Sequence, residues 1–195
     1  AQAGLTYGKD VYDQERYERI RQLSAMMMAD ISNKPVKQEE GLFCNEVGYQ
    51  TPKIDTRATI FKEDKILLVQ EKNGTWSLPG GWCDVNVSVM ENTIKEVKEE
   101  AGLDVVVKNV IAIQDREKHN QPIYAYKVCK IFMLCEVEGG VFKENSETIG
   151  FDYFTKDNLP ILATKKNNEE QIQMCFDAYK AGEKWKTYIV MKVLS

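Results

Sequence analysis

The chain has 195 residues and a formal net charge of −4, so one domain with an extension, or two small domains, is expected. Hydrophobic residues make up 43% of the chain and charged residues 29%, which is typical of a soluble globular protein. The acidic balance argues against a general nucleic-acid-binding protein, because such proteins present a basic surface. DNA is therefore excluded as a partner, and RNA ranks low.

Two further classes are excluded by the sequence. No apolar run approaches the ~20 residues of a membrane span, and no signal peptide is evident, so neither a membrane partner nor export is expected. The five cysteines are scattered and form no C-x-x-C pair. This pattern predicts reduced thiols in a cytoplasmic protein and argues against a zinc site.

The N-terminal part of the chain is predicted to be helical. Residues 1–10 are expected to form a loop. From about residue 13 to 31 apolar residues recur at helical spacing, and they are Tyr17, Ile20, Leu23, Met27 and Ile31. Asp13 or Asp10 would cap this helix, and a second short helix is predicted at about 35–44. An apolar stripe of this kind needs covering, so it indicates a homodimer.

After residue 50 the pattern changes to that of a mixed α/β domain. Two β-rich runs at 56–62 and 65–72 predict a hairpin. A loop is expected at 74–81, a helix at 88–101, and long β segments at 105–117 and 125–140. A short strand at 150–154, a helix at about 167–181 and a last strand at 185–190 complete the prediction. The expected division is a helical domain at 1–50 and an α/β domain at 51–195.

The helix at 88–101 has clear boundaries and an unusual charge pattern. Ser88 and Glu91 fit a capping box, and Gly102 suits the left-handed position just past the helix end. At about 100° per residue, one face carries Met90, Ile94, Val97 and Ala101. The roughly opposite face carries Glu96, Glu99 and Glu100.

These three carboxylates predict a metal site. A solvated surface is the usual interpretation of a charge run, but like charges at this spacing repel each other and lie at the negative end of the helix dipole. The preceding Pro79-Gly80-Gly81 loop can bring its backbone close to a ligand. A hard divalent cation, Mg²⁺ or Mn²⁺, would neutralise the repulsion.

The segment from Gly81 to Leu103 resembles the box that Nudix hydrolases share. The matching residues are Gly81, Glu96, Val97, Glu99, Glu100, Gly102 and Leu103. Two positions depart from the box, because Lys95 replaces an arginine and Val87 replaces the first glutamate. The resemblance covers about residues 52–182 and implies a Nudix α/β/α sandwich with a mixed sheet, of the α/β (α+β) class, preceded by a small N-terminal helical domain.

By this resemblance the protein would be a metal-dependent pyrophosphohydrolase, with Glu96, Glu99 and Glu100 as metal ligands and Glu99 and Glu100 also in catalysis. Lys95 keeps the charge of the arginine but loses its bidentate fork. Val87 can neither bind a metal nor accept a proton. An extra carboxylate from the segment at 142–150 would compensate, with Glu147 favoured over Glu144.

The N-terminal segment narrows the resemblance to one group. The stretches at 4–23, 42–58 and 76–85 are similar to the Gram-positive group typified by CDP-choline pyrophosphatase. This likeness implies a nucleotide substrate, with CDP-choline cleaved to CMP and phosphocholine. ADP-ribose is the alternative substrate. A catalytically inactive, ligand-sensing Nudix-like domain is the alternative of a different class, motivated by Val87.

Four residues are candidates for substrate binding. Arg57, on the first predicted strand, either reaches a phosphate or is a surface charge on an edge strand. Gly81 allows close approach of the backbone. Trp82 either stacks on a base or packs at the edge of the core. Arg116 lies in a loop that is expected to overhang the site.

Overall fold

The computed structural model describes residues 1–33, 35–44, 47–124, 126–142 and 147–189. It divides into two compact units, Ala1–Thr51 and Pro52–Ser195. None of the helices in these ranges combines the length and the apolar character that crossing a membrane requires.

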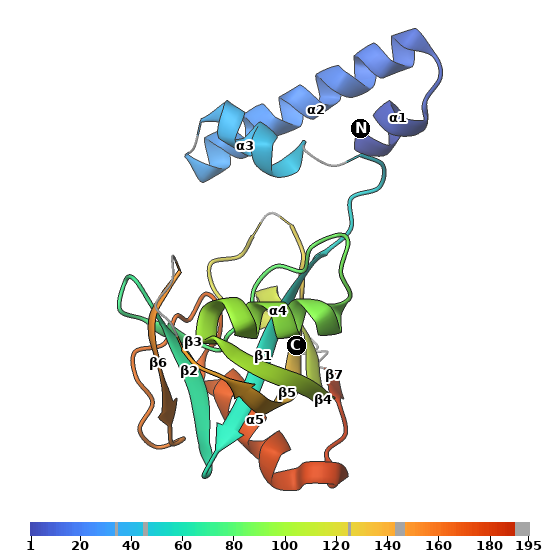
Figure 1. Ribbon diagram of the computed structural model, residues 1–195. Helices are drawn as coiled ribbons and strands as arrows, with labels where there is room; N and C mark the ends of the chain where they lie inside the picture. The colour runs from blue at the N-terminus through green and yellow to red at the C-terminus, as the bar shows by residue number, and fades with distance from the viewer. Residues whose placement is uncertain (34, 45–46, 125, 143–146, 190–195) are drawn as a thin grey trace, which may run out of the picture. The chain divides into compact units, whose positions relative to one another are not determined.

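The N-terminal unit consists of α1 (Gln2–Tyr7), α2 (Val11–Ser32) and α3 (Val36–Phe43) (Figure 1). The loop predicted for residues 1–10 is wrong, because α1 forms there and packs on α2. A Cβ added at Gly4 would lie 2.5 Å from the ring of Tyr17, so this close packing requires glycine. Asp10 caps α2 by accepting a hydrogen bond from the Asp13 backbone N–H at 3.1 Å.

Apart from Tyr17, the apolar stripe of α2 does not pack within this unit. The helix instead buries the small side chains of Ala25 and Ala29. The larger side chains of the predicted stripe lie exposed in this unit, and they are Ile20, Leu23, Met27 and Ile31.

The C-terminal unit is built on a mixed sheet. Its strands are β1 (Lys53–Lys62), β2 (Lys65–Glu71), β3 (Trp76–Ser77), β4 (Leu103–Asp115), β5 (Val128–Gly140), β6 (Thr148–Phe154) and β7 (Tyr188–Ile189). Their order is β3-β2-β1-β5-β4-β7, and β6 pairs with β2. The β1–β5 and β4–β7 pairs are parallel and the others antiparallel. The predicted β1–β2 hairpin is confirmed, with Glu63 and Asp64 both at positive φ in its turn.

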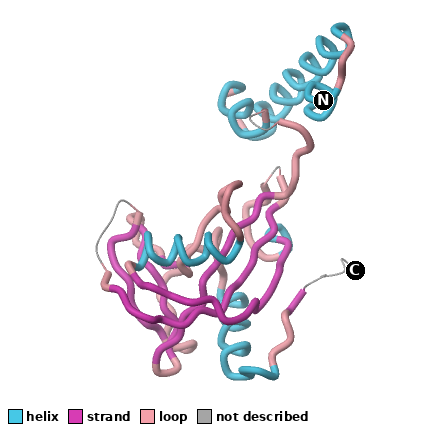
Figure 2. Tube along the Cα trace, turned by 45° about the vertical axis from the view of Figure 1, so that its right-hand side comes forward, coloured by secondary structure: helices cyan, strands magenta, loops and turns pink. Residues whose placement is uncertain are grey.

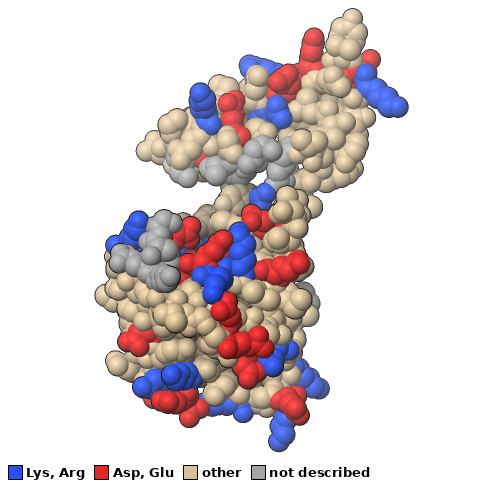
Figure 3. All heavy atoms as spheres, in the orientation of Figure 1, with Lys and Arg blue, Asp and Glu red and all other residues tan. Residues whose placement is uncertain are grey.

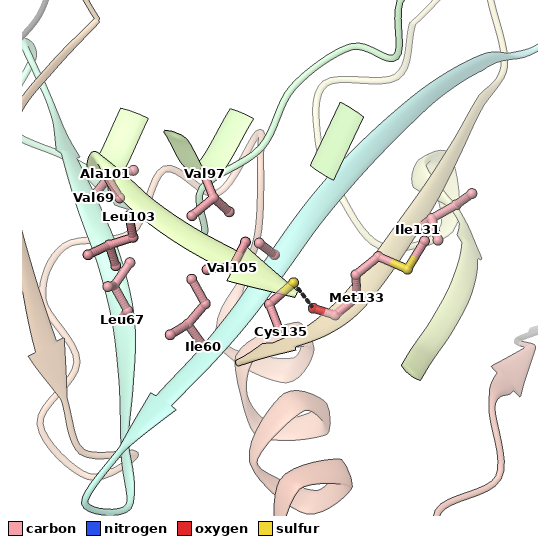
Figure 4. Packing of buried hydrophobic residues seen from close by; sticks show 11 residues of the cluster. Ile60, Leu67, Val69, Val97, Ala101, Leu103, Val105, Ile131, Met133 and Cys135 are labelled. Atoms are coloured by element: carbon pink, nitrogen blue, oxygen red, sulfur yellow. Dashed lines mark hydrogen bonds between the residues drawn. The ribbon is translucent and has the colours of Figure 1, made fainter. Parts of the chain in front are cut away.

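Two helices cover opposite faces of this sheet, α4 (Val89–Ala101) and α5 (Glu169–Ala181) (Figure 2). Figure 4 shows side chains of α4, β1, β2, β4 and β5 converging in the core beneath α4, including Val97, Ile60 and Val105. A second core, with Phe132 and Phe176, lies beneath α5. The predicted α/β/α sandwich is confirmed.

Alternation along β1 divides its polar side chains between the two faces. Thr56 faces α4, where its hydroxyl accepts a hydrogen bond from Asn92 at 2.9 Å. Thr59 faces α5 and contacts the Cys175 sulfur at 3.5 Å. Asp55 and Arg57 share the α5 face with Thr59 by the same alternation, and they form a buried ion pair at 2.6 Å.

Candidate active site

The Pro79-Gly80-Gly81 loop is held against β1 by backbone hydrogen bonds. Thr56 N–H donates to Gly81 O at 2.9 Å, and Ala58 N–H donates to Pro79 O at 2.8 Å. Gly80 has a φ of +144°, and a Cβ there would lie 1.9 Å from Thr56 O. Only glycine can occupy this position without moving the loop or the strand.

Helix α4 begins and ends as predicted. The reciprocal hydrogen bonds of a capping box join Ser88 and Glu91, and Gly102 is left-handed with a φ of 70°. The predicted faces are partly wrong, because Met90 is 51% exposed while Glu96 and Glu100 are buried. Since Glu96 and Glu100 each precede a buried apolar residue by only about 100° of helix rotation, they lie beside the apolar face rather than opposite to it.

Both buried carboxylates lie against the glycine loop. Gly80 N–H donates a 2.8 Å hydrogen bond to Glu100 Oε2. A Cβ on Gly81 would lie 2.7 Å from Glu96 Oε2, which shows how closely that carboxylate approaches the backbone. The loop and the helix thus enclose two carboxyl groups.

The electrostatics of this pair favour a cation. Burial, followed by the charge of Glu100, raises the pKa of Glu96 to about 7. Burial also raises the pKa of Glu100, against the opposing effects of the Gly80 hydrogen bond, Arg57 and Lys166. A divalent cation between these carboxyl groups would remove both the repulsion and part of the burial cost.

Glu99 does not join the other two carboxylates. Its side chain is 58% exposed and lies 3.9 Å from Lys95 Nζ. Within the described ranges no three His, Cys, Asp or Glu side chains lie close enough to hold one metal ion as they stand. The three carboxylates do not meet at one point in this arrangement, and their assignment as metal ligands stays a prediction. Carboxylate oxygens such as those of Glu96 and Glu100 are suitable ligands for a hard divalent cation. Glu99 would have to turn away from Lys95 to become a third ligand.

Lys95 occupies the arginine position of the box and contacts three carboxylates. Its Nζ lies 2.9 Å from Asp84, 3.8 Å from Glu96 and 3.9 Å from Glu99. It can therefore orient the box glutamates, although its shortest contact is to Asp84 rather than to either of them.

Glu147 lies near the buried pair, as its negative charge contributes to the raised pKa of Glu100. Its neighbour Thr148 donates a 2.6 Å hydrogen bond from its hydroxyl to Glu100 O, which holds this segment at the end of α4. Glu144 lies outside the described residues. The catalytic role expected for Glu147 remains a prediction.

Arg57 is not a surface charge on an edge strand, because β1 lies inside the sheet and Arg57 is only 4% exposed. Its guanidinium donates to Asp55 at 2.6 and 3.2 Å and to Leu78 O at 3.2 Å. Lys130 Nζ lies 3.4 Å from the same Asp55. These contacts hold Leu78, which directly precedes the Pro79-Gly80-Gly81 loop. The expected contact of Arg57 with a substrate phosphate stays a prediction.

Arg116 is held within its loop rather than projecting from it. It is buried, and its guanidinium donates to Pro122 O at 2.7 Å and Lys165 O at 3.3 Å. It also lies 3.6 Å from the centre of the Tyr124 ring. Its contacts are those of a residue that fixes loops, and its expected contact with substrate stays a prediction.

Trp82 is 48% exposed directly after the glycine loop. Its ring centre lies 6.3 Å from that of Tyr126, which in turn lies 5.5 Å from that of Tyr124. Packing at the core edge and stacking on a base were the two interpretations of Trp82. Its exposure leaves a ring face accessible to a ligand.

Two buried charged residues beside Arg57 were not predicted from the sequence, and they are Asp55 and Lys130. A signal was present, since Asp55 and Arg57 are charged residues at alternating positions of a strand whose other central residues are apolar or threonine. Charged residues are seldom fully buried unless paired, so this alternation indicates an internal ion pair.

Comparison with known proteins agrees with this geometry. Residues 51–175 match the family described as "NUDIX domain", and residues 1–43 match "UDP-X-like, N-terminal oligomerisation domain". The putative ADP-ribose pyrophosphatase YjhB of Bacillus subtilis is 44% identical over 185 residues, which span 94% of this chain and 89% of that protein.

Two solved structures are similar. An ADP-ribose pyrophosphatase from Streptococcus suis is 54% identical, with a TM-score of 0.67, covering 72% of this chain and 100% of that one. A UDP-X diphosphatase is 32% identical, also with a TM-score of 0.67, covering 95% of this chain and 91% of that one. The chain belongs to the Nudix hydrolase family.

Proposed function

We propose that this protein hydrolyses the diphosphate of a nucleoside diphosphate derivative with the help of Mg²⁺ or Mn²⁺. The observation that carries the proposal is the pair of buried carboxylates, Glu96 and Glu100, enclosed by α4 and the glycine loop. Buried like charges side by side are costly unless a cation accompanies them. A diphosphate substrate is itself strongly anionic, so the same cation would neutralise both the carboxylates and the diphosphate.

In this proposal Glu96 and Glu100 hold the cation, and Glu99 joins them by turning from Lys95. The bound cation would screen the diphosphate, polarise a phosphoryl oxygen and make the attacking water more acidic. Glu147 is assigned as the group that accepts the proton of the attacking water. In this role it would replace the box carboxylate that is absent at Val87. Trp82 is assigned to the base, on which its exposed ring can stack.

The identity of the nucleotide is a finer proposal. The likeness of the whole chain to the CDP-choline pyrophosphatase group favours CDP-choline, cleaved to CMP and phosphocholine. The names of two relatives favour ADP-ribose, and that of a third refers only to UDP-X. We retain CDP-choline as the first choice and ADP-ribose as the second.

The test is a panel of CDP-choline, ADP-ribose and a UDP-sugar, assayed with Mg²⁺ and separately with Mn²⁺. We expect cleavage between the two phosphoryl groups and a higher kcat/KM for CDP-choline than for ADP-ribose. Preference for ADP-ribose would overturn the choice of substrate and leave the reaction intact. Tight binding of nucleotides without any turnover would favour the catalytically inactive sensor.

We further propose that the protein is a cytoplasmic homodimer joined through its N-terminal unit. The exposed apolar stripe of α2 supports this proposal, because such a surface in water favours association with an apolar partner. The match of residues 1–43 to an oligomerisation domain supports the same assignment.

A further inference from the structure

We propose that Lys166 is a phosphate-binding residue of the active site, which contacts the substrate diphosphate from the loop that precedes α5. This inference rests on the proposed function. Lys166 is distant in sequence from the box, yet its ammonium group lies 2.9 Å from Glu71 Oε1 at the end of β2. Glu71 pairs with Thr148, whose hydroxyl bonds to Glu100 O. These contacts place the lysine beside the carboxyl end of α4.

Of the cations near the buried carboxylates, Lys166 is the best placed to contact a substrate phosphate. Three cations interact electrostatically with Glu96 or Glu100, and they are Lys95, Arg57 and Lys166. Arg57 is buried and its guanidinium is held by Asp55 and Leu78 O. Lys95 is surrounded by Asp84, Glu96 and Glu99. The Lys166 side chain is 35% exposed, and its ammonium group forms an ion pair with Glu71.

The backbone around Lys166 is fixed from several sides. Lys166 N–H donates to Ala163 O at 2.7 Å, and the buried Lys130 donates to Lys166 O. The side chain of Asn167 accepts a 2.9 Å hydrogen bond from Leu78 N–H, just before the glycine loop. The loop that carries Lys166 is therefore joined directly to the loop that faces Glu96 and Glu100.

This arrangement suits a phosphate contact. Because the backbone is already ordered, only the flexible lysine side chain needs to settle when a ligand arrives, which lowers the entropic cost of binding. An ammonium group is a compact point charge that binds phosphate without strict geometry. A cation bound at α4 would neutralise one part of the diphosphate, and Lys166 would exchange its contact with Glu71 for another part.

The chain offers a matched control. Lys165 belongs to the same loop, is exposed, and carries the same charge. Lys166→Gln and Lys165→Gln therefore change net charge equally and differ only in which side chain faces Glu71. Glu71→Gln removes the ion pair while keeping the lysine, and Lys166→Arg keeps the positive charge.

The experiment measures binding of inorganic pyrophosphate with Mg²⁺ by calorimetry, and steady-state kinetics on the nucleotide that the wild-type protein cleaves. Lys166→Gln should weaken pyrophosphate binding and lower kcat/KM by about tenfold each, the effect of one lost charged hydrogen bond. Lys165→Gln should stay within about twofold of wild type, and Lys166→Arg should recover part of the loss.

Two results would overturn the inference. One is equal pyrophosphate binding in Lys166→Gln and Lys165→Gln. The other is a loss in Glu71→Gln as large as that in Lys166→Gln, which would show that the ion pair supports only the fold. Pyrophosphate binding that depends on Lys166, in a protein that hydrolyses no nucleotide, would support the inference while the proposed function fails.

Discussion

Glu147 is the residue proposed as the general base. Val87 leaves the box without its first carboxylate, and a general base typically contributes about 10²–10⁴ in rate. Glu147→Gln should therefore lower kcat at least about tenfold, with KM little changed, and the pH–rate profile should lose its acidic limb. Glu144→Gln serves as the control and should be close to neutral. If Glu144→Gln proves the damaging change, the segment is correct and the residue is wrong.

Lys130 is a second residue with a measurable signature. Burial lowers its pKa to about 7, whereas an unfolded lysine titrates near ~10.4. Between these pH values the unfolded chain binds the additional proton, so the free energy of unfolding should rise as pH increases through this window. Lys130→Met should flatten that rise, measured by denaturant unfolding at pH 7, 8, 9 and 10. The exposed Lys165→Met is the control, and equal slopes in both variants would contradict the assignment.

At the scale of elements, the glycine loop allows a paired test. Gly80→Ala places a Cβ 1.9 Å from the backbone O of Thr56, whereas Gly81→Ala places one 2.7 Å from the end of the Glu96 side chain. The backbone of Thr56 cannot move aside easily, whereas the Glu96 side chain can change its rotamer. Gly80→Ala should therefore lower the melting temperature markedly. Gly81→Ala should leave it nearly unchanged while displacing Glu96 and weakening Mn²⁺ binding, measured by calorimetry. Equal melting temperatures for the two variants would contradict this account of the loop.

Elements defined by local signals could be predicted from the sequence. The capping box of α4, Gly102 beyond its end and the hairpin turn at Glu63 and Asp64 are all present in the structure. These features depend on hydrogen bonds and φ angles within a few residues. The same information cannot show how a helix is rotated against its neighbours, which is why Met90 proved exposed and Glu96 and Glu100 buried.

Features that depend on distant contacts could not be predicted. Helix α1 forms where a loop was expected, since its stability comes from packing of Gly4 on Tyr17. Nothing in the sequence distinguishes Lys166 from Lys165, because only the fold brings one of them to Glu71. The burial of Arg57 likewise follows from the place of β1 inside the sheet.

At the scale of the whole molecule, the exposed stripe of α2 predicts self-association. Ile31→Glu or Met27→Glu introduces a charge into this apolar surface and should shift the protein toward monomer in size-exclusion chromatography with light scattering. Gln22→Glu adds the same charge to a different exposed side of α2 and should leave the dimer intact. A wild-type protein that is monomeric at micromolar concentration would contradict the prediction.

The face of the molecule that carries α4 shows acidic and basic side chains intermixed, without a broad basic surface (Figure 3). Such a face suits a small anionic ligand bound with a cation better than a long polyanion, which needs extended positive charge. The low rank of RNA as a partner stays a prediction.

The carboxylates of α4 are proposed to hold the cation that enables diphosphate hydrolysis. The most direct test follows CDP-choline and ADP-ribose by phosphorus NMR with Mg²⁺, comparing the wild-type protein with Glu99→Gln and Glu100→Gln. The account predicts Mg²⁺-dependent cleavage between the two phosphoryl groups, and a kcat lower by orders of magnitude in both variants. Their melting temperature without metal should hold or rise, because a buried or repelling charge is removed. Turnover near that of wild type in both variants would contradict the claim.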